Sequence, residues 1–153
     1  MKQLISIVPS CRKDTLSKGT RSLFWKKMKA EEYSSLALAY IGDAHYAKTV
    51  KRWVIDCEAK MDRMQKHTNR YVSARAQAEI IDSMLAFDLL TEKEIEVYKR
   101  GRNSKAHKAP KNTDPVTYHK STGFEALWGY LYVSGQMERL EQLWDFIRTM
   151  KEK

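Results

Sequence analysis

The hydrophobic residues of this chain follow a helical period from about residue 28 to the C-terminus. Apolar side chains recur three and four positions apart, which places them along one side of a helix. The pattern predicts helices at about residues 28–56, 67–87, 91–100, 114–134 and 136–151. The alternation typical of a half-buried strand is missing from the sequence. We therefore expect an all-α fold.

Three of these segments carry further structural signals. The segment 67–87 has an apolar stripe that comprises Tyr71, Ala74, Ala78, Ile81 and Leu85. The polar residues outside this stripe are Arg70, Arg75, Gln77 and Glu79. Thr91 and Glu94 match a capping box, which predicts a helix start. The last segment has a core-closing stripe of Leu140, Leu143, Trp144, Ile147 and Met150.

Two acidic residues interrupt segments that are otherwise apolar. Asp43 is the only acidic residue in 33–47, and Glu125 is the only one in 121–137. Asp43 continues a stripe formed by Leu36, Ala39, Tyr40, Ala47, Val50 and Val54. Glu125 belongs to a helix that is apolar almost all round, so we expect both side chains to be buried.

A buried carboxylate needs a proton, a cationic side chain or a metal ion. Two carboxylates together with a substrate phosphate are a common way of holding Mg²⁺, and Mn²⁺ accepts similar ligands. A structural salt bridge is the alternative for each acid alone. Asp43 and Glu125 together favour a metal site.

The composition indicates one globular domain with an anionic partner. The chain has 153 residues, of which 42% are hydrophobic, so it can bury a core. Its formal net charge of +9 favours binding to nucleic acid or, less often, to a membrane surface. Trp128, Tyr130, Tyr132 and Trp144 are better explained by core or subunit contacts than by base stacking.

The N-terminal segment and the cysteines bear on location. Cys11 and Cys57 are too few for a disulfide framework and lack CxxC spacing, which favours a cytoplasmic protein. The apolar residues 4–8 are too short for a signal peptide or a membrane span, so we expect no membrane association. Residues 1–22 read as a loosely ordered extension preceding a domain at 23–153, and Met28 is an alternative natural start.

Positive charge is concentrated in residues 99–111, KRGRNSKAHKAPK. This segment contains no acid, and Gly101, Ser104 and Pro110 predict a loop. Its basic groups suit phosphates, and Asn103 or an arginine could reach base edges. The alternative is an ordinary solvated loop.

Four segments resemble the bacterial Mini-III ribonucleases in order and spacing, over about residues 30–150. They are LAYIGDAHY, RYVSARAQAE, YKRGRNSKAHKAPKNTD and STGFEALWGYLY. Mini-III enzymes are ribonuclease III catalytic domains without a separate domain for double-stranded RNA. The resemblance implies a ribonuclease III catalytic-domain-like helical fold and a homodimer forming one RNA-binding valley. It also implies magnesium-dependent cleavage of double-stranded RNA, with a family role in maturing 23S ribosomal RNA precursor.

The resemblance assigns the catalytic and metal-binding positions to Asp43, in IGDA, and Glu125, in FEAL. Full-length ribonuclease III enzymes carry further acids at the positions of Leu36, Ala39 and Thr122. Mini-III enzymes also lack these further acids, and their loss favours one tightly held metal ion. Activation of water by that ion would leave a 5′-phosphate and a 3′-hydroxyl, without a side-chain nucleophile.

The basic segment and the RYVSARAQAE segment supply candidate RNA contacts. The candidates are Arg70, Lys99, Arg100, Arg102, Asn103, Lys105, Lys108 and Lys111. Ser73 and Gln77 join Arg70 as residues that contact the RNA backbone or orient the carboxylates. The competing hypothesis is a noncatalytic double-stranded RNA-binding or ribosome-associated module. A DNA-binding regulator is less favoured, because the sequence has no recognisable recognition helix.

Overall fold

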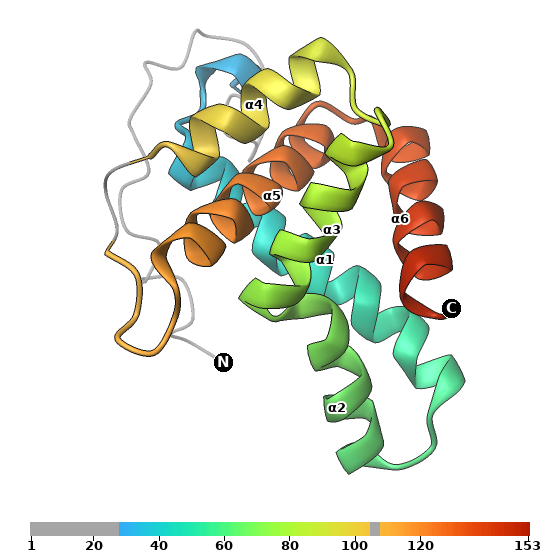
Figure 1. Cartoon of the computed structure of the whole chain (residues 1–153). Coiled ribbons are helices and arrows are strands. Elements are labelled where there is room, and N and C mark those ends of the chain that lie inside the picture. The colour runs from blue at the N-terminus through green and yellow to red at the C-terminus, as the bar shows by residue number, and fades with distance from the viewer. Residues whose placement is uncertain (1–27, 105–107) are drawn as a thin grey trace, which may run out of the picture.

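The computed structural model describes residues 28–104 and 108–153, so residues 1–27 and Lys105 lie outside it. Within the described part there are helices and no strands, which confirms the all-α prediction (Figure 1). The helices are η1 (Ala30–Glu32), α1 (Ser35–Cys57), α2 (Met61–Val72), α3 (Ala74–Ala86), α4 (Glu92–Arg102), α5 (Pro115–Val133) and α6 (Met137–Lys151).

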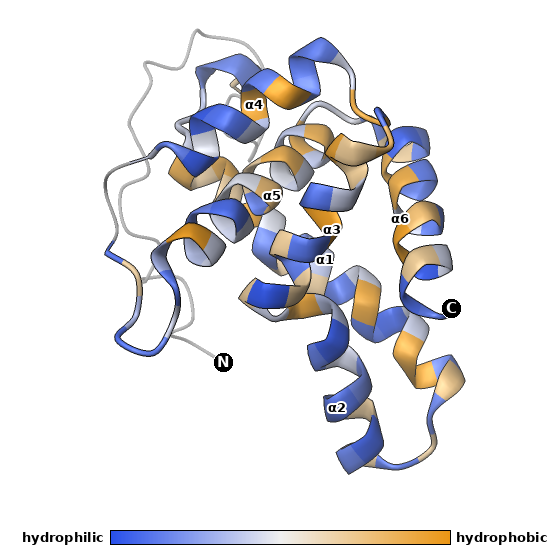
Figure 2. Ribbon diagram, viewed as in Figure 1, coloured by the Kyte–Doolittle hydropathy of each residue, from blue (hydrophilic) through white to orange (hydrophobic). Residues whose placement is uncertain are grey.

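Helix α5 occupies the centre of the fold, with α1, α3 and α4 packed around it and α6 along one flank (Figure 1). Its buried residues include Phe124, Leu127, Trp128 and Tyr130, which pack in the chain's own core. Helix α2, by contrast, is largely hydrophilic (Figure 2). None of the described helices, α5 included, has the length and apolar character needed to cross a membrane.

The predicted helix starts at Thr91 and Asp114 are confirmed. The Thr91 hydroxyl accepts a hydrogen bond from Glu94 N at 3.2 Å, and the Glu94 carboxylate accepts one from Thr91 N at 3.0 Å. Asp114 Oδ2 accepts from Thr117 N at 3.0 Å, with Pro115 in the first turn. These bonds satisfy backbone amides that have no partner inside the helix.

The single helix predicted at 67–87 is wrong, because the chain forms two helices that meet at Ser73. Ser73 is extended, with φ −61° and ψ 151°, and its hydroxyl accepts a hydrogen bond from Ala76 N at 3.2 Å. It therefore caps α3. Helix α2 also starts six residues before the predicted position, at Met61, since its exposed first turns carry no apolar period.

Helices α1 and α5 cross at two glycines. A Cβ atom added to Gly42 would lie 1.8 Å from the carbonyl oxygen of Glu125, and one added to Gly129 would lie 1.9 Å from that of Leu38. Only glycine permits so close an approach of two helix backbones. The crossing fixes the residue before Asp43 against the backbone of Glu125.

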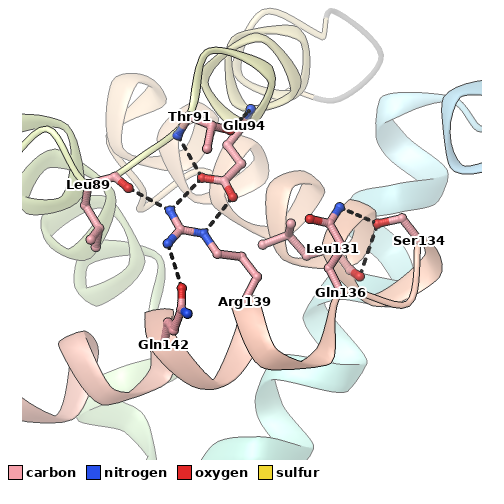
Figure 3. A network of polar contacts seen from close by, with 8 residues as sticks. All are labelled: Leu89, Thr91, Glu94, Leu131, Ser134, Gln136, Arg139 and Gln142. Atoms are coloured by element: carbon pink, nitrogen blue, oxygen red, sulfur yellow. Dashed lines mark hydrogen bonds and ion pairs between the residues drawn. The ribbon is translucent and has the colours of Figure 1, made fainter.

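A buried ion pair ties the start of α4 to α6 (Figure 3). The Arg139 guanidinium donates to Glu94 Oε1 at 2.8 Å, to Glu94 Oε2 at 3.0 Å and to the Leu89 carbonyl at 2.6 Å. Burial alone would raise the pKa of Glu94, but the Arg139 and Thr91 hydrogen bonds hold it below its ordinary value. Glu94 is therefore charged and paired in the folded protein.

Candidate active site

Asp43 of α1 and Glu125 of α5 lie close enough for their carboxyl groups to interact. Burial is the larger cause, and the negative charge of the neighbouring Asp43 the next, of a rise in the pKa of the half-buried Glu125 to about 7. A cation bound between the two carboxyl groups would favour the ionised form of Glu125.

The prediction that Asp43 is buried is wrong, because its side chain is exposed. The buried residues of α1 are instead Leu38, Ala39, Gly42, Tyr46, Val50 and Val54. The buried face is therefore rotated relative to the predicted stripe, and Tyr40 of that stripe is 83% exposed. Gly42 explains the rotation, since its contact with α5 lies at the centre of the face but contributes no apolar side chain to a sequence pattern.

A third polar side chain, Gln77 of α3, completes the surroundings of Glu125. The amide of Gln77 acts to lower the pKa of Glu125, against the larger effect of burial. Gln77 is only 1% exposed, so its expected place outside the buried stripe is wrong. No hydrogen bond of normal geometry joins its Nε2 or Oε1 to a partner within the described residues, although the amide lies near enough to Glu125 to act on its pKa.

The side chains at this site suit a hard divalent cation. Within the described residues no cluster of three or more His, Cys, Asp or Glu side chains forms a ready-made metal site. Two carboxylates and the amide of Gln77, however, come together from α1, α5 and α3. Oxygen donors of this kind suit Mg²⁺ or Mn²⁺, and Mg²⁺ commonly retains water and binds substrate phosphate in its remaining positions.

The start of the predicted basic loop at 99–111 is helical, whereas residues 103–104 and 108–111 lie outside helices as expected. Lys99, Arg100 and Arg102 form the last turn of α4, and Asn103 is its C-cap, so the expectation of a loop is wrong for 99–102. Gly101 does not break the helix but allows α4 to approach α5, since an added Cβ would lie 2.7 Å from Ala126 Cβ.

An open depression of about 580 Å³ lies between the start of α1 and the end of α4. Its lining includes Ser34 and Ser35 from the start of α1, and Lys99, Arg100 and Asn103 from the end of α4. Lys99, Arg100 and the positive N-terminal end of α1 favour an anionic group here, while Glu96 and the C-terminal end of α4 add negative charge to the same lining. Lys108 and Lys111, farther along the segment, are also exposed.

Three other candidates have partners within the protein. The Arg70 guanidinium donates to the Lys151 carbonyl at 3.0 Å, which ties α2 to the end of α6. Arg102 lies over the Tyr98 ring at 5.5 Å and donates to Asn103 Oδ1 at 3.2 Å. Ser73 serves as the α3 cap.

Aromatic residues near the crossing serve the core, as expected. Trp128 is 1% exposed, and its indole nitrogen donates to His45 Nδ1 at 3.0 Å. His45 also stacks on Tyr132, with ring centroids 4.2 Å apart. These contacts occupy the aromatic faces that base stacking would require.

Comparison with known proteins identifies the family. The ribonuclease III domain matches residues 36–136, a span that contains both Asp43 and Glu125. A Mini-ribonuclease 3 of Enterococcus faecalis is 45% identical over 114 residues, covering 74% of this chain and 86% of the relative. One of Streptococcus pneumoniae is 48% identical over 111 residues, covering 72% and 87%. The chain belongs to the Mini-ribonuclease 3 family.

Membership makes this Mini-ribonuclease 3 homologue an endoribonuclease that acts on RNA, and it confirms the resemblance seen in the four sequence segments. The fold agrees with a solved structure. A crystal structure of a protein from Fusobacterium nucleatum aligns with a TM-score of 0.70 at 22% identity, covering 78% of this chain and 95% of the other.

Proposed function

We propose that this enzyme cleaves double-stranded RNA in a magnesium-dependent reaction centred on Asp43 and Glu125. The observation that carries the proposal is the juxtaposition of two carboxyl groups from α1 and α5, where burial and then the charge of Asp43 raise the pKa of Glu125 to about 7. When bound, magnesium supplies positive charge that polarises the scissile phosphate and activates an attacking water. Mn²⁺ is a chemically similar substitute.

Asp43 and Glu125 have different parts in this proposal. Asp43 is exposed, so its carboxylate is accessible to a hydrated cation and to RNA. Glu125 is more buried and loses its proton when a cation binds beside it. Hydrolysis by water breaks the bond between phosphorus and the 3′ oxygen, leaving a 5′-phosphate and a 3′-hydroxyl on the products.

RNA binding is assigned to the end of α4 and the segment that follows it. Lys99, Arg100 and Asn103 line the depression at the start of α1, and they suit the regularly spaced phosphates of a duplex. Lys108 and Lys111 extend this basic surface. An A-form duplex is recognised mostly through its backbone and shape, which agrees with a surface dominated by cations.

A homodimer is part of the same proposal. The exposed side of α1 carries Ala37, Tyr40 and Ala44, of which Tyr40 is 83% exposed. An aromatic side chain this exposed, flanked by small residues, suits contact with a second copy. The patch adjoins Asp43 in sequence, so dimerisation would bring two active sites onto one RNA-binding valley.

The natural substrate that we propose is the cytoplasmic precursor of 23S ribosomal RNA. The four Mini-III-like segments and the kinship with Mini-ribonuclease 3 proteins support this choice. Incubation with a precursor transcript should release the mature ends, which primer extension would map. Indiscriminate degradation would leave the endonuclease activity standing but would argue against a maturation role.

Substrate class and chemistry are tested with labelled duplex RNA, single-stranded RNA and duplex DNA of the same sequence. We expect magnesium-dependent cleavage of the RNA duplex alone, with 5′-phosphate ends, and none by Asp43→Asn. Lys153→Ala, at the exposed C-terminus, is the matched control and should cleave normally. Binding of the RNA duplex by wild-type enzyme without cleavage would favour the noncatalytic module.

A further inference from the structure

Gln77 lacks the partners that a buried amide normally has. It is 1% exposed, and neither Nε2 nor Oε1 forms a hydrogen bond within the described residues. Most buried polar side chains do have such partners, because leaving a donor or acceptor unsatisfied is unfavourable. An apolar residue at this position would avoid the cost, so at least one atom of the amide calls for a partner that the described residues do not supply.

The position of Gln77 identifies the side on which such a partner would lie. Gln77 is buried where α3 packs on α5, the helix that carries Glu125, and its amide lies close enough to interact with the Glu125 carboxyl. Gln77 comes from α3, whereas the two acids come from α1 and α5. The three side chains therefore converge from three different helices.

We propose that Gln77 is a positioning residue of the metal site, with Nε2 directed to the Glu125 carboxylate and Oε1 directed to water held by the cation. The inference rests on the proposed function. An ionised carboxylate only accepts hydrogen bonds, so it takes the donor side of the amide. The oxygen then needs a donor, and Mg²⁺ usually keeps several water molecules that can donate. Both unpaired atoms are satisfied together.

This arrangement predicts opposite effects on folding and on metal binding. Gln77→Leu removes two unpaired polar atoms with little change of volume, so the metal-free variant should melt at the same temperature as the wild type or higher. Loss of an orienting partner should weaken metal binding about tenfold to a hundredfold. A purely structural amide, bridged by a buried water molecule, gives the reverse: lower thermal stability with unchanged metal affinity.

The test measures Mn²⁺ affinity by titration calorimetry and melting temperature by circular dichroism, both without RNA. Gln77→Leu is compared with wild type, with Gln77→Met as an unbranched second variant should the first not fold. Thr68→Val changes another buried polar residue, on α2, and is the control expected to keep wild-type Mn²⁺ affinity.

The outcomes separate this inference from the proposed function. Weaker Mn²⁺ binding with retained thermal stability in a Gln77 variant supports the inference. Unchanged Mn²⁺ affinity in a folded Gln77 variant overturns it and leaves the proposed site of Asp43 and Glu125 intact. Absence of Mn²⁺ binding by the wild type overturns both.

Discussion

Gly42 and Gly129 bring the backbones of α1 and α5 into direct contact, each facing the carbonyl group of a residue on the opposite helix. Gly42 precedes Asp43 and faces the backbone of Glu125, while Gly129 follows Glu125 by one helical turn. The two catalytic candidates therefore share a crossing at which any side chain would force the helices apart.

Gly42→Ala should destabilise the protein and abolish cleavage together. The added methyl group would lie 1.8 Å from the Glu125 carbonyl oxygen, so the helices must separate, at a cost of about 3 kcal/mol or more. Urea unfolding measures the loss. Gly135→Ala is the comparison, because it meets no atom within 4 Å and strains only a backbone with φ +75°, for about 1 kcal/mol. Equal losses of unfolding free energy in Gly42→Ala and Gly135→Ala would contradict close contact between the helix backbones at Gly42.

Arg139→Met should destabilise the protein at neutral pH by about 3 kcal/mol, because it leaves the charge of Glu94 buried and unpaired. The pKa of Glu94 is lowered in the folded protein, so its stabilising effect is complete above the unfolded value of 4.5 and lost as pH falls through the lower folded value. The difference between the variant and wild type should shrink over that acidic range. Urea midpoints that differ equally at every pH would contradict this prediction.

Tyr40→Glu should yield a folded monomer. The side chain is 83% exposed, so the fold loses little, whereas a charge would disrupt contact with a second copy. Light scattering after size exclusion should give half the wild-type mass. Phe87→Glu alters another exposed aromatic residue, on the α3 C-cap, and should remain dimeric. A wild-type enzyme that is already monomeric would refute the proposed dimer.

Arg100→Ala should weaken binding to duplex RNA and make it less sensitive to salt. Removing one interaction with a phosphate makes the plot of log affinity against log salt shallower by about 0.7 to 0.9. The measurement compares the RNA affinities of Asp43→Asn, which is expected to bind without cleaving, and of the double variant Asp43→Asn/Arg100→Ala over a range of salt concentrations. Arg75→Ala is the control, since that residue is exposed on α3 and paired with Glu79. Equal slopes for the proteins with and without Arg100→Ala would show that Arg100 does not contact an RNA phosphate.

The sequence predicted the parts of the fold that depend on local chemistry. The helix start at Thr91 followed from its capping box, and the stripe of α6 followed from apolar spacing; Leu140, Leu143 and Ile147 are buried. The cap at Ser73 was missed because the apolar period continues across it, although a serine beside an alanine-rich segment is a recognisable signal.

The sequence located Asp43 and Glu125 but misjudged their surroundings. Asp43 fitted the apolar spacing of α1, yet the contact at Gly42 determines which face is covered. Gln77 was placed outside the apolar stripe of α3, with a role in contacting RNA or orienting the carboxylates, whereas packing of α3 on α5 buries it. The errors at Asp43 and Gln77 both depend on how closely the helices pack, and the spacing of apolar residues within one helix does not predict that distance.

Competition between protons and metal at Glu125 gives the site a pH dependence. Its pKa is about 7 in the folded protein and 4.5 unfolded, so the metal-free protein loses stability as pH rises between these values. Above about 7 the carboxylate is already ionised, and a cation binds without displacing its proton. The magnesium concentration for half-maximal cleavage should therefore fall as pH rises through about 7.

The most direct test of the carboxylate site is the single-turnover rate of duplex RNA cleavage, measured against magnesium concentration for wild type and Glu125→Gln. We expect a saturable rise in rate for the wild type and no cleavage by the variant at any magnesium concentration, with the variant's circular dichroism unchanged. Cleavage by Glu125→Gln at the wild-type rate and magnesium requirement would contradict the assignment of this site.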